Sequence, residues 1–187
     1  QQKVLDWRQR IKELKLYSKC ITVYHPACVT YDAYVSQLDD SESRYVALEG
    51  DRPQLRPRLN YLKLIRAAYD KKVKVHVFAM TKSEFLKNYP VYSTDSTSWK
   101  SGTMYGAFYF FHRGNLKLVS LPKKKQLKTQ HIKKVFSLVK QAPYLKNIFH
   151  SSARWSRFKR FEISCHGFRE FQNHLTSYWT TRGIVWN

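Results

Sequence analysis

The residues best placed to do chemistry in this chain lie between positions 73 and 102. Two short β-rich runs there each end in polar residues, and the second delivers Asp95 into the hydroxyl-rich run STDSTS at 93–98. Hydroxyl and backbone donors around Asp95 can hold an ionised carboxylate, which suits a nucleophile or an electrostatic stabiliser. Barrel enzymes keep their chemistry at the carboxyl ends of strands in β/α repeats. Asp95 is therefore the expected catalytic residue.

Polar residues also end the other expected strands. They are His25, Glu49, Asp51 and Thr81, and the strand that leads to Thr81 includes Met80. Because the carboxyl ends of parallel strands meet at one edge, these residues are expected to converge with Asp95. His76 lies inside an alternating strand and is interpreted as a satisfied core histidine. Phosphate-loop, dinucleotide, zinc-protease and serine-hydrolase motifs do not occur in the sequence.

Helical and β patterns alternate along the chain. The expected helices are 4–17, 31–38, 59–70, 82–88, 130–141 and 168–180, and the expected strands are 20–25, 44–48, 73–80, 91–94 and 161–165. Thr81 and Glu84 form a capping box before the helix at 82–88. Two more strands, 104–111 and 116–121, are expected to pair as a hairpin. Strands that alternate with helices predict an α/β fold with a parallel sheet.

The length limits how much of a barrel can form. A closed eight-stranded barrel needs about 200 residues or more, and these 187 residues hold only about five βα-type units and one hairpin. The pattern predicts an incomplete barrel, an open sheet or a piece of something larger. We expect residues 1–187 to form one domain.

The charge of the chain predicts a polyanionic partner. The net charge is +21, from 34 Lys and Arg against 13 Asp and Glu, which is typical of nucleic-acid binding. Residues 116–160 contain no acid and interleave aromatic side chains with cations, so this region is expected to face RNA. An acidic membrane is the main alternative, but the cations span several expected elements rather than one amphipathic helix. The expected RNA-binding residues are Lys117, Lys123, Lys124, Lys125, Lys128, Lys133, Lys134, Lys140, Lys146, Arg154, Arg157, Lys159 and Arg160.

The cysteines indicate a reducing compartment, of which an organelle matrix is one example. Cys20, Cys28 and Cys165 are too few for a disulfide framework and form no C-x-x-C pair. We expect no metal site, because the side chains of Cys165 and His166 diverge, and we expect no cofactor. No apolar run approaches the roughly 20 residues of a membrane span, and the N-terminal residues lack the apolar core of a secretory signal. No membrane association is therefore expected.

Three segments resemble the tRNA-guanine transglycosylase superfamily, and most closely its compact phage and bacterial relatives. They are HVFAMTKSEFLKNYPVYSTDSTSW at 76–99, RYVALEGD at 44–51 and WTTRGIVW at 179–186, within a looser likeness from about residue 21 onward. The resemblance implies the second half of a (β/α)8 TIM-type barrel. It also implies that Asp95 falls on the aspartate that forms a covalent link to ribose when a deazaguanine base replaces guanine. The substrate-binding residues that it implies are His25, Glu49, Gly50, Met80 and Thr81.

Departures from the family point away from catalysis by this chain alone. Glu49 occupies one of the glycine positions at which the family's backbone approaches the base. The strands that supply carboxylates for base recognition and proton transfer have no counterpart, and neither has the Cys-rich zinc site of the longer enzymes. We therefore predict an RNA-binding structural subunit of a ribonucleoprotein, such as an organellar or divergent ribosome. Its partners would be rRNA or tRNA and other protein chains, one of which could complete the barrel.

Two other functions are kept as alternatives. The first is one half of a split transglycosylase, a queuine or deazaguanine tRNA-ribosyltransferase-like enzyme whose other half is a second chain. The second is a phage or mobile-element protein that acts on modified bases in DNA. A partner chain with two strand-end carboxylates would favour the split enzyme.

Overall fold

The computed structural model describes residues 2–25, 29–50, 60–120 and 157–186, with single positions at 137 and 142. The chain divides into two compact units, one of Gln1–Ser96 with Ile184–Asn187 and one of Thr97–Gly183. The first contains a four-stranded parallel sheet that alternates with helices, and the second contains a two-stranded antiparallel sheet. The predicted α/β class, with parallel strands and one hairpin, is confirmed. The prediction of one domain stays a prediction.

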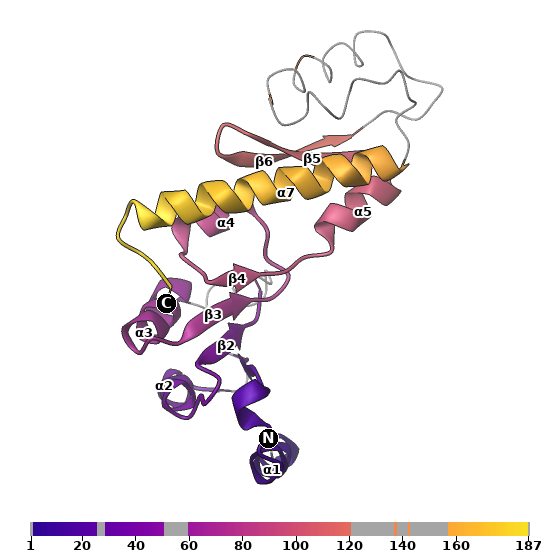
Figure 1. Cartoon of the computed structure of the whole chain (residues 1–187). Helices are drawn as coiled ribbons and strands as arrows, with labels where there is room; N and C mark the ends of the chain where they lie inside the picture. The colour runs from indigo at the N-terminus through magenta and orange to yellow at the C-terminus, as the bar shows by residue number, and fades with distance from the viewer. Residues whose placement is uncertain are drawn as a thin grey trace. The chain divides into compact units, whose positions relative to one another are not determined.

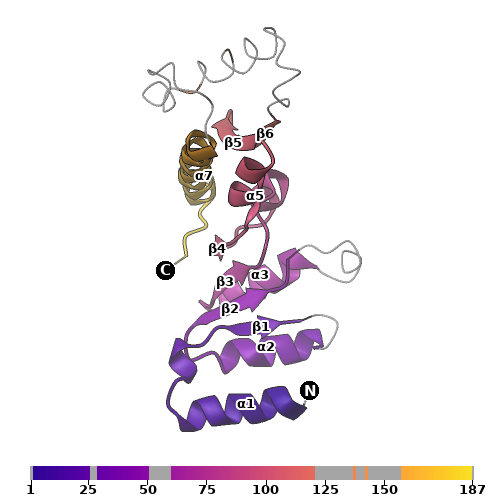
Figure 2. The same ribbon diagram turned by 90° about the vertical axis from the view of Figure 1, so that its right-hand side faces the viewer.

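The first unit begins with helix α1 and continues as a β/α repeat. Its elements are α1 (Gln2–Glu13), a 3-10 helix η1 (Tyr17–Lys19), β1 (Thr22–Tyr24), α2 (Tyr31–Asp39), β2 (Tyr45–Leu48), α3 (Tyr61–Asp70), β3 (Lys74–Val77), α4 (Ser83–Asn88) and β4 (Ser93–Thr94). The strands are parallel and lie in the order β1-β2-β3-β4, which is their order in the chain. Figures 1 and 2 show this succession of strands.

Side-chain caps begin two of these helices. The Thr30 hydroxyl accepts a hydrogen bond from the Ala33 amide before α2, and the Asn60 side chain accepts one from the Lys63 amide before α3. These caps satisfy donors that the first turn of a helix leaves without partners. The predicted capping box at Thr81 is wrong. Because α4 begins at Ser83, its N-cap is Lys82, and Thr81 lies one position too early.

The sheet has one apolar face and one polar face. Register pairs Val46 with Val75 and Leu48 with Val77, and all four side chains are buried. Helices α2 and α3 lie on the same side of the sheet in Figure 1, and the ring of Tyr24 on β1 meets the ring of Tyr34 on α2. Because side chains alternate along a strand, the other face carries a different set of residues, which includes Tyr45, His76 and Ser93.

The second unit packs a long helix on a hairpin. It contains α5 (Ser98–Met104), β5 (Ala107–His112), β6 (Asn115–Ser120) and α7 (Arg157–Thr180). Gly167 of α7 lies against β5 so closely that a Cβ atom there would meet the Phe110 Cα at 2.9 Å. The expected hairpin is confirmed, whereas α5 was not predicted.

The predicted strand at 161–165 is wrong, because those residues belong to α7. Ile163, Ser164, Gly167 and Phe171 are the buried residues of this helix, at helical spacing. A short apolar run does not distinguish a buried strand from a helix segment, and here the contact with β5 selects the helix.

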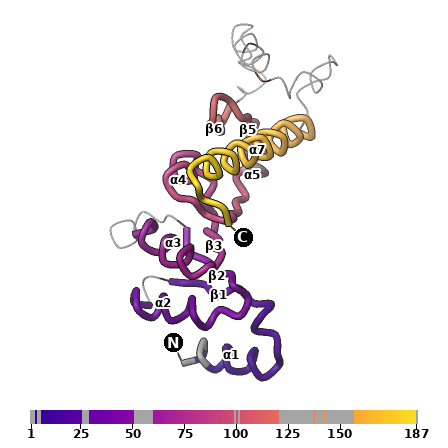
Figure 3. The backbone as a smooth tube through the Cα atoms, turned by 60° about the vertical axis from the view of Figure 1, so that its left-hand side comes forward, coloured from indigo at the N-terminus to yellow at the C-terminus, as the bar shows by residue number. Residues whose placement is uncertain are grey.

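The predicted helix at 130–141 lies outside the described residues apart from position 137. Among the helices that the structure describes, none has the length and apolar character needed to cross a membrane. In the tube of Figure 3, α1 lies at the end of the first unit that carries β1 and α2.

Candidate functional site

A tight turn after β3 forms the frame of the candidate site. The Phe78 amide donates to the Leu48 carbonyl at 3.1 Å, and a Cβ atom on Gly50 would stand 2.0 Å from the Phe78 carbonyl oxygen. Only glycine permits this approach of the chain after β2 to the chain after β3. Ala79 then adopts a left-handed backbone with φ of 54°. Such a conformation costs an L-residue about 1 kcal/mol or more, so its neighbours must hold it.

Thr94 and Asp95 hold this turn from the other side. The Thr94 hydroxyl lies 2.7 Å from the Val77 carbonyl oxygen and also contacts the Met80 carbonyl oxygen. The Ala79 amide donates to Asp95 Oδ1 at 2.7 Å. Contacts from the end of β4 therefore hold the strained turn in place. The turn itself provides the Ala79 amide as a hydrogen-bond donor to the Asp95 carboxylate.

The same oxygen of Asp95 also contacts a histidine. His76 Nε2 lies 3.4 Å from Asp95 Oδ1, and the His76 side chain is only 14% exposed whereas that of Asp95 is 61% exposed. The Ala79 amide and the His76 imidazole both contact Oδ1, and these contacts hold the carboxylate in one orientation. The site therefore presents an oriented carboxylate that solvent, and a ligand, can reach.

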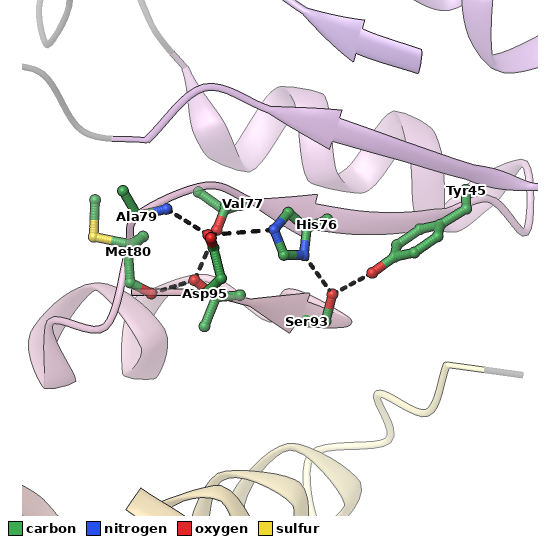
Figure 4. Close-up of polar contacts among 8 residues, drawn as sticks. Tyr45, His76, Val77, Ala79, Met80, Ser93 and Asp95 are labelled. Carbon is green, nitrogen blue, oxygen red and sulfur yellow. Dashed lines mark hydrogen bonds and ion pairs between the residues drawn. The ribbon is translucent and has the colours of Figure 1, made fainter. Parts of the chain in front are cut away.

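His76 connects Asp95 to two hydroxyl groups further along the sheet. His76 Nδ1 lies 2.7 Å from Ser93 Oγ, and the Tyr45 hydroxyl contacts the same oxygen. Figure 4 shows the four side chains in one row, from Tyr45 through Ser93 and His76 to Asp95. We call these four residues the Tyr45–Asp95 row. They come from three adjacent strands or their ends, so the parallel register assembles them.

A second polar pair lies at the ends of β1 and β2. His25 Nδ1 is 3.6 Å from Glu49 Oε2, with the His25 side chain 54% exposed and the Glu49 side chain 13% exposed. The Glu49 carbonyl accepts a hydrogen bond from the Tyr61 hydroxyl at 2.9 Å. Glu49 therefore has a local structural partner in α3 as well as the histidine beside it.

The residues predicted to bind substrate occupy different roles. Met80 is buried and Thr81 is half-buried, next to the turn that Asp95 holds. Gly50 is buried and acts through the backbone approach to Phe78. The structure thus places Gly50, Met80 and Thr81 around the Asp95 turn, and it pairs His25 with Glu49.

Most of the predicted RNA-binding residues lie outside the described part of the chain. Lys117, Arg157, Lys159 and Arg160 are described, and the other nine are not: Lys123, Lys124, Lys125, Lys128, Lys133, Lys134, Lys140, Lys146 and Arg154. Lys117 and Arg157 are exposed, and Lys159 forms an ion pair with Glu162 at 3.9 Å. Arg160 donates to the Thr103 carbonyl at 3.2 Å and so connects α7 to the end of α5. Arg160 therefore has a structural contact within the second unit.

Other charged groups of the hairpin support the basic character of this unit. The pKa of His112 is lowered, first by partial burial of the ring and then by the nearby positive charges of Lys117 and Arg113. All three causes disfavour the charged form of the imidazole. Across the described residues, no group of three or more His, Cys, Asp or Glu side chains could hold a metal ion.

The contacts of three residues of the site are not apparent from the sequence. His76 is expected from its pattern to be a core residue, Tyr45 has no expected role, and Ser93 is expected only as one of the hydroxyl groups around Asp95. All three lie on the polar face of the sheet, and the signal that could have found them is the alternation of polar with buried residues in KVHV at 74–77. Alternation alone does not give the register that sets His76 opposite Ser93.

Comparison with known proteins gives no independent assignment for this arrangement. The chain matches no protein-family model, no curated protein and no solved structure.

Proposed function

We propose that this chain is an RNA-binding structural subunit of a ribonucleoprotein assembly. The observation that carries the proposal is the net charge of +21, together with an acid-free region at 116–160. So large an excess of one sign destabilises a compact state by self-repulsion and favours association with a polyanion. The aromatic residues among the cations add groups on which unpaired bases can stack.

The arrangement of the sheet supports an origin in a transglycosylase-like half barrel. The strand order follows the chain order, and α2 and α3 lie on one side of the sheet (Figure 1). In a doubly wound sheet the order of strands reverses at a switch point, whereas in a barrel consecutive strands stay adjacent. Four parallel strands in chain order therefore support the proposal of a half barrel over that of a doubly wound sheet.

RNA binding is tested by titrating the full chain against labelled tRNA and rRNA fragments over a range of salt. We expect tight binding whose logarithm falls linearly with the logarithm of salt concentration. Duplex DNA of equal length is the competitor. Weaker competition by DNA than by unlabelled RNA supports the proposal. Stronger competition by DNA would instead favour the alternative of a protein that acts on modified bases in DNA.

A second candidate function is base exchange in RNA, and the geometry of Asp95 favours it. The carboxylate is oriented by Ala79 and His76 and is still accessible, which are requirements for a nucleophile. In this reaction a carboxylate oxygen would bond to the ribose C1′ as the glycosidic bond breaks. The leaving base would take the bonding electrons and a proton, and an incoming base would reverse the step. A partner chain would supply the proton donor.

Base exchange is tested by incubating the chain with labelled guanine and bulk tRNA, alone and with the proteins that co-purify with it. Incorporation that disappears in Asp95→Asn would establish the enzyme and displace the structural subunit. No incorporation under either condition, combined with salt-dependent RNA binding, supports the structural subunit.

A further inference from the structure

The row from Tyr45 to Asp95 permits only one direction of hydrogen bonding when the histidine is neutral. An ionised carboxylate can only accept, so the 3.4 Å contact of His76 Nε2 with Asp95 Oδ1 is favourable in the neutral ring only when Nε2 carries the proton. Nδ1 of the neutral ring is then an acceptor, so the Ser93 hydroxyl must donate to it. The Ser93 oxygen is left to accept from the Tyr45 hydroxyl. Each donor in the row has one acceptor, in the direction of Asp95.

We infer that His76 is a positioning residue for Asp95 and that Ser93 selects the tautomer in which His76 can do this. The neutral ring has two tautomers, and only the one with the proton on Nε2 can donate to the carboxylate. A hydroxyl that donates to Nδ1 favours this tautomer, as a second hydrogen bond does for histidine ligands of metals. The chemical purpose of the row rests on the base-exchange candidate, but its geometry does not.

The same residue types, Ser, His and Asp, also form the catalytic triads of serine hydrolases. The contacts of Ser93 favour positioning instead. In a triad the serine oxygen is directed at the substrate, whereas Ser93 Oγ lies between the imidazole and the Tyr45 hydroxyl. Tyr45 is itself held in place, since its ring meets the ring of Tyr92 edge to face at 5.6 Å. Ser93 is therefore the centre of the row, and Asp95 is its exposed end.

The first test is nitrogen NMR of the His76 ring in the full chain, at a pH at which the ring is neutral. We expect the Nε2–H tautomer in the wild type and a mixture of tautomers in Ser93→Ala. Tyr45→Phe is the matched control, since it removes a hydroxyl from the row and leaves the Ser93 donor to Nδ1. An Nδ1–H tautomer in the wild type, or an unchanged tautomer in Ser93→Ala, overturns the inference.

The second test is the carbon NMR signal of the Asp95 carboxylate, assigned by its loss in Asp95→Asn. His76→Gln retains a side-chain N–H donor and is expected to keep this signal close to its wild-type position. His76→Leu keeps a side chain of similar size but removes the N–H donor, so the carboxylate signal of Asp95 should shift. Equal spectra in His76→Leu and wild type, or capture of Ser93 by a fluorophosphonate, would contradict the positioning role. Absence of base exchange in the wild type would count against the enzyme candidate alone.

Discussion

At the residue scale, the Asp95 site depends on one glycine and one strained alanine. Gly50 lets the chain after β2 approach the Phe78 carbonyl, and Ala79 turns its amide toward Asp95 through a φ of 54°. Backbone held in a costly conformation by surrounding contacts is common where a protein positions functional groups. Of the residues near this turn, Asp95 was expected to be catalytic, and Gly50 was a substrate-binding residue that the resemblance implied.

Gly50→Ala is expected to destabilise the protein by about 3 kcal/mol or more, because it places a methyl group 2.0 Å from a backbone oxygen. The free energy of unfolding, measured with denaturant, checks this. Gly102→Ala is the matched control. The nearest atom to its added Cβ would be a Tyr109 ring carbon at 3.4 Å, so it should change stability by no more than about 1 kcal/mol. Equal effects of the two substitutions would contradict the packing of Gly50 on Phe78.

Asp95→Asn and Asp95→Ala should differ in stability as well as in any activity. Asparagine keeps an oxygen that can accept from the Ala79 amide, whereas alanine removes it. We expect Asp95→Ala to lose about 1 kcal/mol relative to Asp95→Asn, the usual net value of one hydrogen bond. Thermal and denaturant unfolding of the two variants measure this difference. If the two unfold alike, the carboxylate does not hold the turn.

At the element scale, buried tyrosines join the helices of the first unit to each other and to the sheet. The Tyr34 hydroxyl of α2 donates to the Leu64 carbonyl of α3 at 3.1 Å, and its side chain is fully buried. Burial raises the pKa of Tyr34 strongly, and the nearby Tyr24 and Tyr31 raise it further. The folded protein therefore stabilises the neutral form of the Tyr34 phenol relative to the ionised form.

This shift makes a prediction about alkaline stability. The pKa of Tyr34 is raised in the folded state, so its contribution is complete below the unfolded pKa of about 10 and is lost as pH rises above it. The free energy of unfolding of the wild type should fall relative to that of Tyr34→Phe by about 1.4 kcal/mol per pH unit above about pH 10. Unfolding curves of both proteins at neutral and alkaline pH test this. Parallel pH profiles would show that Tyr34 ionises in the folded protein.

Local patterns predicted the repeat of the first unit well. The helix 31–38 is observed as Tyr31–Asp39, the strand 44–48 as Tyr45–Leu48 and the helix 59–70 as Tyr61–Asp70. Each has its own period of apolar residues and its own boundary signals, so no distant contact is needed to recognise it. The errors at 161–165 and at α5 occur where packing on the hairpin, rather than local preference, selects the structure.

At the scale of the whole molecule, charge dominates the expected behaviour. The net charge of +21 and the acid-free region at 116–160 are properties of composition, and they act over distances longer than any single contact. RNA binding should therefore respond to salt and to the removal of cations from this region, even when the site around Asp95 is intact.

Replacement of Lys123, Lys124, Lys125, Lys133 and Lys134 by Gln should reduce the salt dependence of RNA binding. Each lost phosphate contact on single-stranded RNA lowers the log–log slope by about 0.7. The control replaces Lys3, Lys15, Lys19, Lys82 and Lys87, which removes the same formal charge outside the region. Affinity measured across a salt series distinguishes the two variants. An unchanged slope in the first variant would place the RNA footprint outside residues 116–160.

The sequence by itself determined the α/β class, the excess of positive charge and the candidacy of Asp95, because composition and short-range periodicity carry these properties. Only the tertiary structure decided what surrounds Asp95. Parallel pairing sets His76 beside Ser93, and the close approach of Gly50 to Phe78 joins the ends of β2 and β3. A shift of one residue in register would send His76 to the apolar face. Register is set by the packing of the whole apolar face, so local sequence does not contain it.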